Sequence, residues 1–164
     1  MQYNREVRAG IGLIGRDDEI DTLTRFLDGA GRGALVIRGE AGVGKTAVVE
    51  EIVGRAVATG WRIVRAAGVE AETSFALSGL NQIVFALREE LAQIGAEDQA
   101  VLAPVLGADA TSAPAPMPLV MALLSLLTQA ARHHPLLVVV EDVHWFDDVS
   151  ASVLNAAGRR LSDP

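Results

Sequence analysis

The sequence predicts an α/β fold with a parallel sheet, because short apolar runs alternate along the chain with segments of helical periodicity. Three runs have the length and composition of strands, at residues 34–38, 61–66 and 136–140. A run rich in β-branched residues and apolar on both faces is typical of a strand buried in a parallel sheet. Because three strands are few for such a sheet, we expect the sheet to be incomplete at its C-terminal side.

Helices are expected where apolar residues recur at helical spacing. These segments are residues 17–27, 45–59, 77–92, 97–106, 118–133 and 150–161. Pro104 is expected to bend or end the fourth of them, and Asp148 or Ser150 to cap the last one. Residues 107–116, rich in Ala, Pro and Ser, are the expected mobile loop.

Composition excludes several classes of protein. Half of the residues are hydrophobic and none is cysteine, which excludes a disordered tail, a disulfide framework and a thiolate metal site. The net charge is −7 and there is no basic run, so we expect no direct binding to DNA. The longest apolar stretch, residues 119–127, is too short to cross a bilayer, and the N-terminus lacks the apolar core of a signal peptide. We therefore expect a cytoplasmic protein without a membrane partner.

The strongest chemical signal fits the pattern G-x-x-x-x-G-K-[ST]. It consists of Gly39, Glu40, Ala41, Gly42, Val43, Gly44, Lys45 and Thr46. Glycines let such a loop turn its backbone N–H groups towards phosphate oxygens, and the following helix adds positive charge at its N-terminus. Lys45, the only lysine of the chain, would reach the β- and γ-phosphates, and the Thr46 hydroxyl would bind Mg²⁺. The alternative is a glycine turn that happens to end in Lys-Thr.

A second signal is the pair of acids Glu141 and Asp142 at the end of the third apolar run. Ligands of α/β sheets bind at the carboxyl ends of the strands, so this position favours a role in the site. Glu141 would hold Mg²⁺, and Asp142 would polarise a water molecule for attack on the γ-phosphate. The alternative is that the two acids only end a strand and begin a loop.

Four segments together resemble a known family. The upstream sequence IGRDDEI (14–20), the glycine-rich segment LVIRGEAGVGKTAVVE (35–50), GVEAETSFALSGL (68–80) and LLVVVEDVHWFD (136–147) resemble the AAA-type ATPase domain of STAND-class regulators. These include MalT-like and large LuxR-type ATP-binding transcription factors. The phosphate loop is shared by all P-loop proteins, whereas the Glu-Asp-x-His-Trp run and the upstream Gly-Arg are more particular to this family.

The resemblance implies a P-loop NTPase three-layer sandwich in which the whole chain, residues 1–164, is one ATPase domain. It implies ATP or ADP as ligand, Mg²⁺ as cofactor, and slow hydrolysis that serves as a switch. Residues 39–46 would be the Walker A loop and Glu141 and Asp142 the Walker B pair, and the backbone at Gly15 and Arg16 would lie near adenine. Many relatives have Asp at the position of Glu141.

Family members continue beyond this point with a further strand, a helical lid, sensor repeats and a DNA-reading helix-turn-helix. We therefore expect this chain to be the N-terminal part of a longer architecture, and the missing strand to pair beside residues 34–38. Self-association, or contact with the missing regulator domains, would follow from the unpaired edge.

Three functions remain open at this stage. The first is a switch ATPase in a regulator, the second a nucleotide-dependent scaffold without turnover, and the third a small P-loop kinase. The acid pair suits activation of water, which favours an ATPase over a kinase. No guanine-reading Asn/Thr-Lys-x-Asp signature is present, which favours ATP over GTP.

Overall fold

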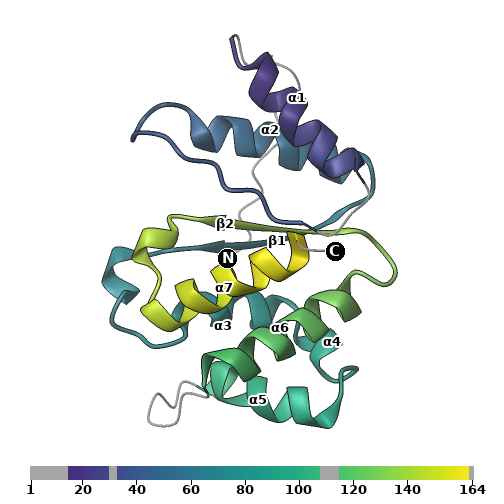
Figure 1. Cartoon of the computed structure of the whole chain (residues 1–164), viewed down its shortest axis with the longest axis vertical. Helices are drawn as coiled ribbons and strands as arrows, with labels where there is room; N and C mark the ends of the chain where they lie inside the picture. The colour runs from purple at the N-terminus through teal and green to yellow at the C-terminus, as the bar shows by residue number, and fades with distance from the viewer. Residues whose placement is uncertain (1–14, 30–32, 108–114, 163–164) are drawn as a thin grey trace, which may run out of the picture.

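The computed structural model describes residues 15–29, 33–107 and 115–162. Helical and extended segments alternate along these residues (Figure 1). In chain order the elements are α1 (Asp17–Asp28), α2 (Lys45–Ala58), β1 (Arg62–Ala67), the 3-10 turn η1 (Glu70–Glu72), α3 (Ser78–Ala86), α4 (Arg88–Leu91), α5 (Ala96–Gly107), α6 (Pro116–Ala130), β2 (Leu136–Glu141), the 3-10 turn η3 (Val143–Trp145) and α7 (Asp148–Ser162).

The sheet of the described residues consists of β1 and β2, which pair in parallel from Arg62 opposite Leu136 to Ala67 opposite Glu141. Parallel strands need a long crossover connection, and here helices α3 to α6 supply it. The predicted α/β class with a parallel sheet is confirmed. Both strands end at the same edge, which places Glu141 beside Ala67.

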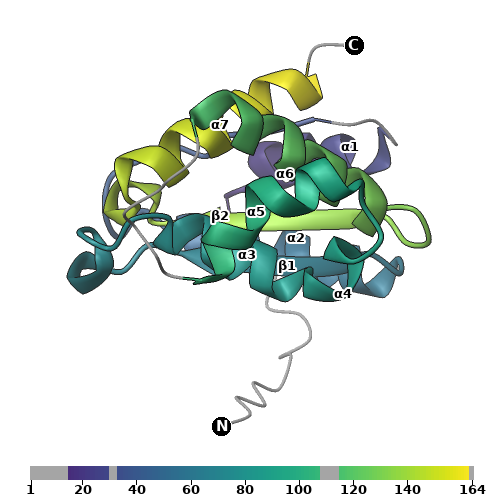
Figure 2. The same cartoon turned by 90° about the horizontal axis from the view of Figure 1, so that it is seen from below.

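Helices cover both faces of the strand pair. Alternate residues of β1 point to opposite faces, so Val64 and Ala66 join a large core with α3, α5, α6 and α7. Ile63 and Leu137 face a smaller cluster formed by α1 and α2. Figure 1 shows α1 and α2 on one side of the strands and the other helices on the opposite side, and Figure 2 shows the second group in front of the strands. The result is three layers, with a much thinner core under α2.

The prediction of a buried strand at residues 34–38 is wrong. This segment has no strand pairing, and Leu35, Val36 and Ile37 are 41%, 72% and 37% exposed. At its start, the Ala34 backbone N–H donates to the hydroxyl of Ser162 at the end of α7. An apolar run becomes a buried strand only when neighbouring strands supply hydrogen bonds at its edges, and among the described residues none lies there. The segment stays extended and exposed.

The predicted single helix at residues 77–92 is also wrong, because α3 and α4 are separate. The Arg62 guanidinium of β1 pairs with Glu90 and donates a hydrogen bond to the Ala86 carbonyl. This hydrogen bond occupies a backbone acceptor at the end of α3. The remaining helices are confirmed within a few residues, and Pro104 lies inside α5 without ending it. Pro116 begins α6, as proline at a first helical position can, and the rest of the expected mobile loop, 108–114, lies outside the described residues. No helix in the described ranges has both the length and the hydropathy to cross a membrane.

The cap of α7 is Asp147, not Asp148 or Ser150. The Asp147 Oδ1 accepts a hydrogen bond from the Ser150 backbone N–H at 3.0 Å. Ser150 itself is fully buried, and its hydroxyl accepts a hydrogen bond from the Leu80 backbone N–H, which ties α7 to α3. The loop after β2 is therefore fastened to the large core just beyond Asp142.

Replacing Asp147 with alanine is expected to lower the free energy of unfolding by about 1 kcal/mol, because the first turn of α7 loses its acceptor. Urea denaturation followed by circular dichroism measures this change. Asp147→Asn keeps the accepting oxygen and serves as the control, with an expected change of a few tenths of a kcal/mol. Equal losses in both variants would contradict the capping role.

Candidate nucleotide-binding site

Residues 39–44 form a tight turn between the extended segment and α2. Gly42 and Gly44 have φ angles of 79° and 91°, a left-handed conformation that glycine adopts without strain. A Cβ at Gly39 would lie 2.9 Å from Val43 Cγ1, so this position also favours glycine. Gly44 is the N-cap of α2 and offers no side chain, which leaves the first N–H groups of the helix free of side-chain caps. The turn therefore presents backbone donors at a helix N-terminus, the arrangement that binds phosphate.

Lys45 begins α2 and bends back over this turn. Its ammonium donates to the carbonyl oxygens of Gly39 and Glu40, both at 2.9 Å. An ammonium has three donors, and a phosphate oxygen is a stronger, charged acceptor than a neutral carbonyl. The side chain is thus held above the turn by contacts that an incoming phosphate can replace.

Helix α1 contacts the same turn through Arg16. The guanidinium donates to the Val43 carbonyl at 2.5 Å and to the Glu19 carboxylate at 2.7 Å. The hydrogen bond from Arg16 holds the pKa of the Glu19 carboxyl below its usual range. Gly15, just before Arg16, has a φ of 74° and turns the chain into α1. Arg16 of the upstream Gly-Arg pair therefore contacts the turn directly.

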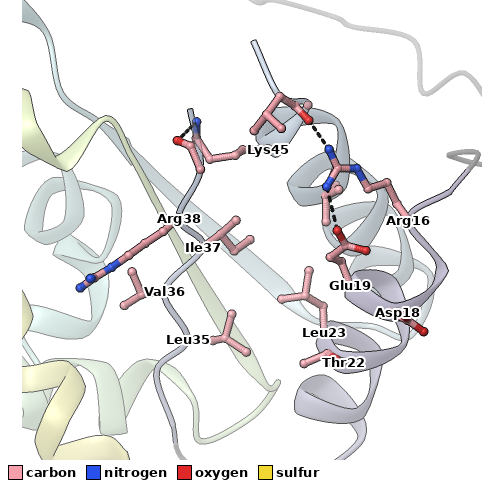
Figure 3. Close-up of a pocket in the computed structure, with 14 residues that line it drawn as sticks. Arg16, Asp18, Glu19, Thr22, Leu23, Leu35, Val36, Ile37, Arg38 and Lys45 are labelled. Atoms are coloured by element: carbon pink, nitrogen blue, oxygen red, sulfur yellow. Dashed lines mark hydrogen bonds and ion pairs between the residues drawn. The ribbon is translucent and has the colours of Figure 1, made fainter. Parts of the chain in front are cut away.

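A cavity of about 400 Å³ lies between α1, the extended segment and the turn, within the range of small-molecule sites. Figure 3 shows Leu35 and Ile37 pointing towards α1 and Val36 and Arg38 pointing the other way, a strand-like alternation without strand pairing. Leu23 closes the cavity from α1. The described lining residues are Arg16, Asp18, Glu19, Thr22, Leu23, Leu35, Val36, Ile37, Arg38, Gly39, Val43, Gly44, Lys45 and Val48. The cavity combines apolar walls with a charged rim and the phosphate-type turn.

The two acids lie at the carboxyl end of β2, on the same side of the molecule as the turn (Figure 1). Asp142 is exposed and has a φ of 49°, a left-handed conformation. The backbone N–H of Gly68 donates to the Glu141 carbonyl at 3.0 Å, which extends the strand pairing to the end of β2. Thr46, Glu141 and Asp142 are not among the described residues that line the cavity. Of the other predicted site residues, Arg16, Gly39, Val43, Gly44 and Lys45 line the cavity, and Gly15, Glu40, Ala41 and Gly42 do not.

The donor set suits a Mg²⁺ ion that arrives with phosphates. In the described ranges, no group of three or more His, Cys, Asp or Glu side chains is placed to hold a metal by itself. Mg²⁺ usually keeps several water molecules and is bound through one or two protein oxygens together with substrate phosphates. The Thr46 hydroxyl and the Glu141 carboxylate are oxygen ligands of this kind.

Sequence reasoning missed Arg65, which lies next to Glu141. Its Nη1 is 3.5 Å from Glu141 Oε2, while the guanidinium makes two hydrogen bonds of 2.8 Å to the carboxylate of Glu50 on α2. The hydrogen bonds to Glu50 raise the pKa of Arg65 above its usual value. An Arg between the apolar residues Val64 and Ala66, on the opposite face of β1, was the signal in the sequence, but its partner depends on the strand register.

The family of the chain follows from its sequence pattern. Residues 12–164 match the AAA ATPase domain family. The chain belongs to this family. The match spans α1, the glycine turn and the acids at the end of β2.

Among curated proteins, this AAA ATPase domain is similar to "Uncharacterized protein R02095" of Rhizobium meliloti (strain 1021). The two are 31% identical over 183 residues, which cover 94% of this chain and 18% of the relative. The chain therefore spans less than a fifth of the length of that relative. No solved structure gives a significant match.

Proposed function

We propose that this domain binds ATP with Mg²⁺ and hydrolyses it slowly, as a switch within a longer regulator of the STAND class. The observation that carries the proposal is the glycine turn at the N-terminus of α2, with the Lys45 ammonium held above it and a cavity of about 400 Å³ beside it. Membership of the AAA ATPase domain family supports nucleotide binding and hydrolysis. The role as a switch rests on the resemblance of the motifs to MalT-like and LuxR-type regulators.

Each part of the site has a proposed task. The N–H groups of the turn and Lys45 would bind the β- and γ-phosphates, because both present positive charge at one point. The base and ribose would occupy the cavity, with Leu23 and Leu35 against the apolar surface of the ring and Arg16 at its edge. The proposed place of the Gly15 backbone near adenine rests on the family resemblance alone. When bound, Mg²⁺ would neutralise the developing phosphate charge, held by Thr46 and Glu141.

Asp142 is the proposed residue that orients the attacking water. Its exposed carboxylate directly follows Glu141, the proposed metal-binding acid, and lies at the carboxyl end of the sheet. Positioned proton acceptors contribute about 100- to 10,000-fold to rates. Asp142→Asn is therefore expected to leave ATP affinity within about twofold and to reduce phosphate release by at least about 100-fold. Release of phosphate at the parent rate from this variant would remove Asp142 from the mechanism.

Titration calorimetry of the purified chain with ATP and MgCl₂ tests the proposed function. We expect saturable binding of ATP that excess GTP displaces poorly. A folded chain that binds neither ATP nor ADP would overturn the proposal. A phosphate assay then separates the alternatives: free phosphate indicates an ATPase, unchanged ATP a scaffold, and a phosphorylated acceptor a kinase.

A further inference from the structure

Three charged side chains from three elements form a row across one face of the strand pair. Arg65 of β1 makes its two 2.8 Å hydrogen bonds to Glu50 of α2 and lies 3.5 Å from Glu141 of β2. The register explains the second contact, because Ala67 pairs with Glu141 and Arg65, two residues earlier, points to the same face. This face is the one covered by α2, the helix that begins at the phosphate-type turn.

The row contributes little to folding stability. The side chains of Arg65, Glu50 and Glu141 are 38%, 49% and 28% exposed, and ion pairs this accessible to water are worth little. The geometry is nevertheless specific. The fork of two hydrogen bonds to Glu50 fixes the plane of the guanidinium, and its Nη1 is shared by the two carboxylates.

Glu50 and Glu141 compete for the same nitrogen, Nη1 of Arg65. When Glu50 binds Arg65 more strongly, less of the guanidinium's charge and hydrogen bonding is available to Glu141. Arg65 and a divalent cation are both positive, so they compete for the Glu141 carboxylate. Glu50 therefore makes the Glu141 carboxylate more available to a divalent cation, and Arg65 makes it less available.

Resting on the proposed function, we propose that Arg65 is a positioning residue that holds the Glu141 carboxylate until Mg²⁺ arrives with the nucleotide, and that Glu50 sets the strength of this hold through Arg65. The domain then discriminates between metal-free and metal-bound nucleotide at the sheet as well as at the phosphate turn. Glu50 needs no contact with nucleotide or metal for this effect.

The test is the Mg²⁺ dependence of ATP binding, measured by calorimetry as the ratio of the dissociation constants in EDTA and in MgCl₂. Removing the competing cation in Arg65→Gln is expected to raise this ratio about two- to fivefold, and Glu50→Gln is expected to lower it by a similar factor. Damage to the fold would lower the ratio in both variants. An increase in one variant and a decrease in the other therefore identify the positioning role. ATP affinity in EDTA, which depends on the turn and Lys45, is expected to stay within about twofold of the parent.

Two further variants make the inference specific. In Glu50→Gln/Arg65→Gln, loss of Glu50 is expected to have no effect beyond that of Arg65→Gln, because Glu50 acts only through Arg65. Glu51→Gln removes the same charge from the neighbouring position of α2, where the carboxylate pairs with Arg55 at 3.1 Å, and is expected to leave the ratio unchanged.

The outcomes separate the inference from the function beneath it. Three results would overturn the role of Arg65: shifts of the ratio in the same direction, shifts no larger than that of Glu51→Gln, or additive effects in the double variant. If ATP still binds in EDTA, the proposed function is unaffected by these results. Absence of ATP binding by the folded parent, with and without MgCl₂, would overturn both.

Discussion

Lys45→Ala is expected to weaken ATP binding by about 100-fold or more. Hydrogen bonds to charged groups contribute about 1.5–3 kcal/mol each, and about 1.4 kcal/mol corresponds to a factor of ten in affinity. The side chain would make two such contacts with phosphates, in place of its present bonds to the carbonyls of Gly39 and Glu40. Titration calorimetry with ATP and MgCl₂ measures the loss.

Folding of this variant is expected to be nearly unchanged, because the hydrogen bonds of the Lys45 ammonium go to exposed carbonyls of the turn. Lys45→Arg separates charge from geometry. It keeps the positive charge but replaces a compact ammonium by a planar fork, so we expect it to recover only part of the affinity. Binding by Lys45→Ala as tight as that of the parent would mean that the turn is not a phosphate site.

Local patterns in the sequence predicted most of the helices and both strands of the sheet. Periodicity reports which residues of one segment face the core, and it placed α1, α2 and β2 within one or two residues of their ends. The extended segment at 34–38 has an equally apolar pattern but no partner among the described residues, which leaves Val36 72% exposed. Strand pairing depends on two segments, so the pattern of a single apolar run does not predict it.

The same distinction separates the predicted and unpredicted parts of the site. The turn from Gly39 to Thr46 is contiguous, so residue types and spacing alone were enough to predict a phosphate-binding role for it. Arg65 meets Glu141 only because β1 and β2 pair in one particular register, across more than seventy residues of chain. The capping role of Asp147 was also missed, because α7 begins earlier than its apolar pattern suggests.

Gly68→Ala is expected to destabilise the domain by about 3 kcal/mol, at the upper end of the usual cost of overpacking. A Cβ at this position would lie 2.1 Å from the Asp142 carbonyl oxygen and 2.8 Å from Trp145 Cβ. The nearest obstacle is backbone, which has no rotamer to change. The strand end must therefore separate, and the Gly68 N–H is then expected to lose its bond to the Glu141 carbonyl.

Because Asp142 lies at the point of collision, the substitution is expected to disturb the site as well as the fold. Thermal unfolding followed by circular dichroism measures the first effect, at about 2–4 °C per kcal/mol for a chain of this size, and phosphate release the second. Gly54→Ala is the matched control, since a Cβ there meets nothing within 4 Å and the residue lies inside α2. Alanine favours a helix interior over glycine, so this variant is expected to gain up to about 1 kcal/mol. Equal stability of Gly68→Ala and the parent would contradict the close approach of β1 to Asp142, and with it the backbone contact that holds the acid pair at the sheet edge.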